Sequence, residues 1–200
     1  MSALTVQHEH EPERGEGWEG LVRRWEDTDR PEGCKVEIIE GIVTVAPPPV
    51  NRHNYIADLV HEGLYAAKPD DCGIYQTLNV AVPTRNGLYI PDLAVVPRDV
   101  VRREGNYVPA DTAEIVVEIT SKSNASNDRV AKLNGYAAAG VPLYLLIDPH
   151  VSGTPTVHLY GEPQGGTYRL LSVVEFGEPI HIPKPFDCTL DTSDFPLPCR

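Results

Sequence analysis

The sequence predicts an α/β (α+β) protein with a mixed central β-sheet flanked by helices. Strand-like segments alternate with segments of helical period in the order strands, helix, three strands, helix, strand and hairpin. The longest apolar run, residues 141–147, has seven residues, far short of the roughly 20 needed to cross a bilayer. A sheet covered by helices, with a β-hairpin near each end of the chain, is the simplest way to bury these segments.

The N-terminal part of the chain divides into a tail and a short helix. Residues 1–15 are polar and rich in Gly and Glu, which predicts a disordered acidic tail ahead of a single domain at 16–195. Trp18, Leu21 and Trp25 recur at helical spacing. This spacing predicts a short helix that lays one apolar stripe on the domain.

A hairpin and a helix follow. Two β-rich runs within 35–46 meet at Glu40-Gly41, which predicts the first hairpin. Apolar residues at helical spacing then predict a helix over 51–67, with Asn51 or Asn54 as its N-cap.

The rest of the chain is rich in strands and contains one further helix. The predicted strands are 74–82, 88–96, 113–120 and 141–147, followed by a hairpin of 155–161 with 167–174. The predicted helix runs from Ser126 to Ala139, with Val130, Leu133 and Ala137 on its apolar stripe. Five prolines beyond Phe176 predict an extended C-terminal strap.

The composition excludes some functions. Seventeen basic and 29 acidic residues give a net charge of −12, which excludes a strongly basic coat for nucleic acid. The N-terminus has no apolar stretch after a basic start, so no secretory signal is predicted and we expect a cytoplasmic protein without membrane contact. The four cysteines form no CxxC pair, which indicates thiols rather than a zinc site.

Two acids stand in otherwise apolar strand segments. Asp92 follows Pro91 in the segment 88–96, and Glu118 lies in the segment 113–120. An ionised carboxylate without a partner in such surroundings costs several kcal/mol, so a compensating group is expected. A divalent cation would compensate both acids at once, although acids at strand ends that are either exposed or salt-bridged remain the alternative.

The order and spacing of several short motifs resemble one family. The motifs are VEIIEGIVTVAP, RH before a helix, PDLAVV, VVEIT-S, an Asp–Lys–Tyr helix and GVPLYLLIDP. Together they cover about residues 18–195 and resemble the Uma-two family of restriction-endonuclease-like proteins, which is widespread in bacteria. The resemblance implies the fold of PD-(D/E)XK nucleases, a mixed sheet with helices on either side.

The resemblance also implies a site, position by position. Asp92 and Glu118 match the family's two strand acids. The PD-(D/E)XK pattern has a lysine two residues after the second acid, but position 120 of this chain is a threonine. Lys132 matches a lysine in the following helix, which the resemblance implies as the replacement. Glu37 matches an acid before the Gly41 turn. His53 matches a histidine that opens the first long helix and is a candidate for substrate binding.

Several assignments stay open at the level of the sequence. Lys122 stands where the family usually has a proline, so it is a second candidate for the functional lysine and for substrate binding. Lys132 lies four residues after Asp128, and an exposed ion pair would explain that spacing equally well. Glu37 and Glu40 lie on opposite faces of their strand, so at most one of them faces the site.

We therefore expect a metal-dependent DNA endonuclease. Asp92 and Glu118, with the carbonyl of Ile119, would hold Mg²⁺ or Mn²⁺, Lys132 would orient a water, and Glu37 would steady a second ion or a water. The alternative is a nuclease fold retained as a non-catalytic binding module, which the acidic charge and the absent strand lysine favour. The resemblance further implies a homodimer.

Overall fold

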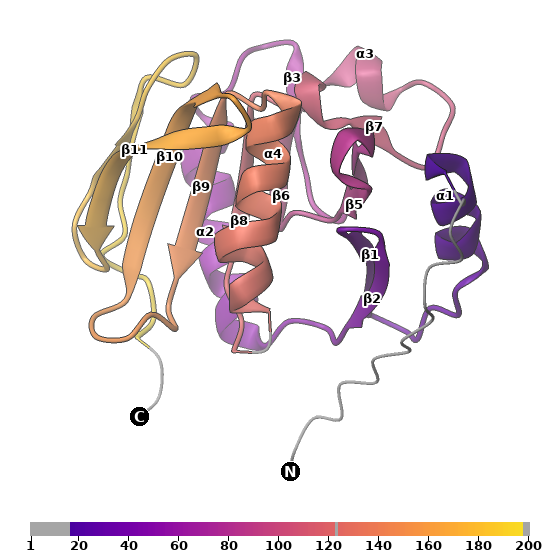
Figure 1. Ribbon diagram of the computed structural model, residues 1–200. Helices are drawn as coiled ribbons and strands as arrows, with labels where there is room; N and C mark the ends of the chain where they lie inside the picture. The colour runs from indigo at the N-terminus through magenta and orange to yellow at the C-terminus, as the bar shows by residue number, and fades with distance from the viewer. Residues whose placement is uncertain (1–16, 123, 198–200) are drawn as a thin grey trace.

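The computed structural model describes residues 17–122 and 124–197 (Figure 1). The helices are α1 (Trp18–Asp27), α2 (Asn51–Tyr65), α3 (Arg98–Val101) and α4 (Leu133–Ala139), with the 3-10 turns η1 (Pro83–Arg85) and η2 (Ala110–Thr112) and the π-helical segment η3 (Asn127–Lys132). The strands are β1 (Lys35–Ile39), β2 (Ile42–Ala46), β3 (Cys72–Tyr75), β4 (Val80–Val82), β5 (Gly87–Tyr89), β6 (Leu93–Pro97), β7 (Val108–Pro109), β8 (Ile115–Ile119), β9 (Leu143–Asp148), β10 (Thr156–Gln164), β11 (Thr167–Glu175), β12 (Ile180–Ile182) and β13 (Cys188–Leu190).

These strands form two larger sheets. One has five strands in the order β2-β1-β5-β4-β7, and the other has six in the order β11-β10-β9-β8-β6-β3. Strands β8 and β9 run parallel while the other pairs of the six-stranded sheet are antiparallel. Strands β12 and β13 form a separate pair. The predicted mixed sheet and both hairpins are confirmed.

Helices α2 and α4 lie on opposite faces of the six-stranded sheet (Figure 1). On one face Val95 and Val117 pack with Val60 of α2. On the other face Val96 and Val116 pack with Tyr136 of α4. Alternate residues of one strand therefore belong to two different cores, as expected for a sheet that is buried on both sides.

The chain crosses between the two sheets at two points where the sequence predicts continuous strands. The segment 74–82 contributes to β3 and β4, and the segment 88–96 contributes to β5 and β6, which belong to different sheets. Thr77 has a positive φ of 57°, and Pro91 has no amide hydrogen for a ladder, so each crossing has a local cause. Asp92 consequently lies at a crossing and not inside a strand.

The start of α2 differs from the prediction. The N-cap residue is Val50, and no side chain caps the helix. Asn51 is already helical, and the amide of Asn54 donates to the Val50 carbonyl over 3.2 Å. The expectation of an asparagine N-cap is therefore wrong, because the helix begins before either side chain could act as a cap.

The predicted helix 126–139 begins with the π-helical segment η3. Its wider turn changes which residues face the core. Val130, expected on the buried stripe, is 58% exposed, whereas Asp128 and Lys132 are buried. The alternative of an exposed pair between Asp128 and Lys132 is thus wrong, and both side chains point into the protein.

The remaining sequence predictions concern the ends of the chain. The tail at 1–15 lies outside the described residues, and a single domain over 16–195 stays a prediction. Within the described part of the chain, no helix has the length and apolar character needed to span a membrane.

Candidate active site

Asp92, which immediately precedes β6, lies near Glu118 of the adjacent strand β8. Strand β6 pairs with β8 in antiparallel register, with Leu93 opposite Val117. The amide of Asp92 donates to the Val117 carbonyl over 3.0 Å, which holds Asp92 beside the end of β8, and Asp92 lies near enough to Glu118 for their charges to repel. The crossing at Pro91 thus leaves one acid at the start of β6, beside the other acid in β8.

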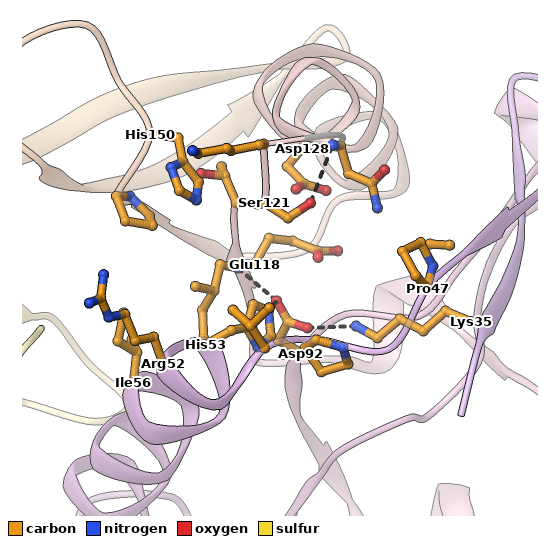
Figure 2. A pocket seen from close by; sticks show the side chains of 18 of the residues that line it. Lys35, Pro47, Arg52, His53, Ile56, Asp92, Glu118, Ser121, Asp128 and His150 are labelled. Atoms are coloured by element: carbon orange, nitrogen blue, oxygen red, sulfur yellow. Dashed lines mark hydrogen bonds and ion pairs between the residues drawn. The ribbon is translucent and has the colours of Figure 1, made fainter. Parts of the chain in front are cut away.

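Asp92 is held by three groups. Its Oδ2 atom accepts from the Ile119 amide at 2.7 Å and lies 3.0 Å from His53 Nε2, while its Oδ1 atom lies 2.5 Å from Lys35 Nζ. In Figure 2 a dashed line joins Lys35 and Asp92. Although burial opposes ionisation, His53 and Lys35 hold the pKa of Asp92 well below its usual range. Asp92 is therefore a stable anion.

Glu118 belongs to a second cluster that is centred on Lys132. The Lys132 Nζ atom lies 2.8 Å from Glu37 Oε1, 3.2 Å from Glu118 Oε1 and 3.4 Å from Asp128 Oδ1. The Tyr136 hydroxyl also donates to Glu118 Oε1 over 3.2 Å. The side chains of this cluster come from four segments, β1, β8, η3 and α4, so the cluster forms only when the whole fold is assembled.

Crowding of carboxylates changes their protonation. Burial, and then repulsion from Asp128, Asp92 and Glu37, raises the pKa of Glu118 well above its usual range against the attraction of Lys132. Burial raises the pKa of Asp128 to about 6, again against the attraction of Lys132. These carboxyl groups therefore take up protons more readily than exposed ones do.

The fixed charges of the two clusters do not balance. When they are ionised, the carboxylates outnumber the two ammonium groups of Lys35 and Lys132, and the excess is −2 with His53 neutral. The four carboxylates are those of Glu37, Asp92, Glu118 and Asp128. Burying this excess is costly. One divalent cation would neutralise it.

Residues of both clusters line a cavity of about 470 Å³. Its lining includes the cationic or titratable groups Arg52, Lys122 and His150, and residues 47–50 form an apolar wall. A second cavity of about 290 Å³ shares Lys35, Pro49, His53 and Asp92 with the first. The acids are thus reachable from a hollow that also carries basic groups, although the chain as a whole is acidic.

Thr120 stands where the PD-(D/E)XK pattern has a lysine, and its side chain has a structural role. Thr120 is buried, and its hydroxyl donates to Asp148 Oδ1 over 2.8 Å. Asp148 also accepts from Arg129 Nε at 2.7 Å and from Arg129 Nη2 at 2.9 Å. Arg129 belongs to η3, so this network fixes the segment that carries Lys132 against the ends of β8 and β9.

The structure separates the candidates that the sequence left open. Glu37 lies in the cluster, where its Oε1 atom also accepts from the Ile90 amide at 2.7 Å. Glu40 lies at the hairpin turn and pairs with Arg85 instead. Lys132 is buried among the acids, whereas Lys122 is exposed and lines the cavity.

Lys122 does not join either cluster. In the described part of the chain it forms no ion pair with any of the four acids, all of which pair with Lys35 or Lys132. Its place in the lining of the cavity is compatible with contact to a substrate. The geometry therefore favours Lys132 over Lys122 as the lysine of the acidic cluster.

Lys35 and Asp128 lie in the site, although the sequence does not predict either of them as a site residue. Lys35 precedes Glu37 by two residues, so strand alternation puts both on one face, and this signal is present in the sequence. Asp128 fits an ordinary surface ion pair, because nothing in a helical period reveals a π-helical turn.

The fold and the paired acids define the class of this protein. A mixed sheet between α2 and α4, with one carboxylate in β8 and another just before the adjacent strand β6, is a restriction-endonuclease-like fold. One solved structure with this fold is a protein of Anabaena variabilis ATCC 29413 described as "a putative nuclease belonging to DUF820". The two share a TM-score of 0.66 and 20% sequence identity, over 90% of this chain and 96% of the other.

The sequence match then gives the family. Residues 18–193 match the Uma2 family, described as "Putative restriction endonuclease", and the chain belongs to that family. This confirms the resemblance drawn from the sequence. Among curated proteins, no significant match to the chain was found.

Proposed function

We propose that the chain is an endonuclease that hydrolyses phosphodiester bonds of DNA with Mg²⁺ or Mn²⁺. The observation that carries the proposal is the pair of neighbouring acids, Asp92 and Glu118, which line a cavity whose lining also carries basic groups. Membership of a family described as a restriction endonuclease supports the same reaction class.

The donors present fit a hard divalent cation. Asp92 and Glu118 supply carboxylate oxygens, and the Ile119 carbonyl points to the same side as the Ile119 amide that contacts Asp92. In the described residues, no three His, Cys, Asp or Glu side chains gather closely enough to hold a metal by themselves. Mg²⁺ typically binds one or two carboxylates and keeps several waters, so a two-acid site suits it.

The bound ion would polarise the phosphate and lower the pKa of a water. The protein supplies the rest. Glu37 and Asp128 keep Lys132 beside Glu118, where its charge would stabilise the transition state. His53 lies beside Asp92 and lines both cavities, and its buried Nδ1 atom has no partner among the described residues.

Nicking of supercoiled plasmid tests this proposal. Wild-type protein should nick in Mg²⁺ or Mn²⁺ and stop in chelator, while Asp92→Asn and Lys132→Ala should lose about a hundredfold in rate or more. Lys68→Ala is the matched control, because Lys68 lies beside Tyr65 and lines neither cavity. Nicking that survives Asp92→Asn would indicate a contaminating nuclease and remove the proposal.

A non-catalytic binding module is the second candidate. It is favoured by Asp92, both of whose oxygens already have protein partners. DNA binding without nicking under every metal condition would support it. A homodimer and a cytoplasmic location stay proposals that gel filtration and cell fractionation would test.

A further inference from the structure

We propose that Lys35 occupies the Asp92 oxygen that a divalent cation would take, and that it moves to the substrate phosphate when the cation binds. This inference rests on the proposed function. It assigns a role to a lysine that the motifs of the sequence do not single out.

The two oxygens of Asp92 differ in what holds them. Oδ2 accepts from the backbone amide of Ile119, which the β8 strand fixes, and it also contacts His53. Oδ1 contacts the Lys35 ammonium alone among the described side chains. A cation that binds Asp92 without disturbing the strand must therefore bind on the Oδ1 side, where it meets Lys35.

The two lysines of the site differ in exposure and in the number of hydrogen-bond donors that remain unused. Lys132 is 4% exposed, and its three donors face three carboxylates, so it has none left for a phosphate. The Lys35 side chain is 21% exposed and contacts Asp92 and the Ile90 carbonyl, which leaves one of its three donors for another acceptor. Its long, flexible stem allows the ammonium group to move.

The surroundings of Lys35 leave space into which its ammonium group can move. It lines both cavities, which share Lys35, His53 and Asp92. A divalent cation at Asp92 would repel the ammonium group, and a phosphate in the cavity would attract it. The same side chain would then neutralise Asp92 before binding and the phosphate after it.

Chemical labelling of lysines measures this exchange directly. Wild-type protein is treated with an amine-acetylating reagent, and each lysine is quantified by mass spectrometry in chelator, in Mn²⁺, and in Mn²⁺ with a DNA duplex. Labelling of Lys35 relative to Lys68 should rise about tenfold in Mn²⁺, which corresponds to the loss of one charged hydrogen bond. It should fall again when the duplex is added.

Substitution provides the second measurement. Lys35→Met keeps an unbranched side chain and removes the charge that competes with the cation. Mn²⁺ affinity, measured by calorimetry without DNA, should rise about tenfold, while the nicking rate falls about a hundredfold. Lys68→Met should change neither quantity.

The outcomes separate the two proposals. If wild-type protein binds Mn²⁺ and nicks DNA, but Mn²⁺ changes neither the labelling of Lys35 nor, in Lys35→Met, the affinity, then this inference is wrong and the proposed function stands. If neither wild type nor Lys35→Met binds Mn²⁺, both are wrong. Higher Mn²⁺ affinity with undiminished nicking would show that Lys35 only neutralises Asp92, which also overturns the transfer.

Discussion

Replacing Lys132 with Met should destabilise the fold strongly when divalent ions are absent. Lys132 is 4% exposed and lies within 3.4 Å of Glu37, Glu118 and Asp128. Removing one partner of a buried charged cluster typically costs about 3–5 kcal/mol, because the remaining charges stay buried without compensation. For a chain of this size, that loss corresponds to a fall in Tm of about 10 °C or more.

The loss should depend on pH in a defined direction. Burial already raises the pKa of Asp128 to about 6 and that of Glu118 well above its usual range. Between the unfolded and folded pKa values the native state binds more protons than the unfolded state, so stability falls as pH rises. Without Lys132 both carboxyls hold protons more tightly, and the variant should lose less at about pH 5 than at about pH 8.

Urea unfolding followed by far-UV circular dichroism measures both effects in chelator. Lys68→Met serves as the control for charge removal, and the double variant Lys132→Met/Glu118→Gln should recover part of the lost stability, because it removes one uncompensated charge. A Lys132→Met variant that stays within about 1 kcal/mol of wild type at high pH would refute the account of the buried cluster.

Three further predictions concern single side chains. Asp148→Asn should cost about 1–2 kcal/mol of unfolding free energy, since it weakens the hydrogen bonds from Arg129. Burial opposes ionisation of Asp148, but these bonds lower its pKa. The stability that ionised Asp148 contributes should therefore be lost as pH falls below about 4, which a series of unfolding measurements would show. Tyr89→Phe should leave stability unchanged or raise Tm slightly, because the buried Tyr89 hydroxyl has no partner among the described residues; a large loss in calorimetry would contradict this. Glu37→Gln should reduce nicking about tenfold or more, whereas Glu40→Gln, in an exposed pair, should change neither nicking nor stability by more than about 0.5 kcal/mol.

Much of the fold can be predicted because it follows from apolar patterning. The alternation around Glu40-Gly41 and the continuous run 141–147 lead directly to β1, β2 and β9. The two crossings between sheets cannot be predicted in this way, because the residues at Thr77 and Pro91 interrupt a ladder without interrupting the apolar pattern. Which sheet a segment joins depends on contacts distant in sequence.

The candidate site can be predicted in part for a similar reason. Asp92 and Glu118 stand out because a carboxylate in an apolar strand requires a partner. Lys35 does not stand out, because a lysine at the start of a hairpin strand is ordinary. Its role appears only when the fold puts Asp92 beside it.

The π-helical segment has a consequence for how the protein tolerates change. In a regular α-helix, successive side chains are separated by about 100° around the axis, since one turn takes 3.6 residues. The wider turn of η3 reduces that separation, and both Asp128 and Lys132 lie on the inner side of this segment. Deleting a single surface residue such as Val130 would tighten the coil, keep the helix, and rotate the ammonium group away from its acids. The buried cluster around Lys132 thus depends on the count of residues in one turn as much as on their identity.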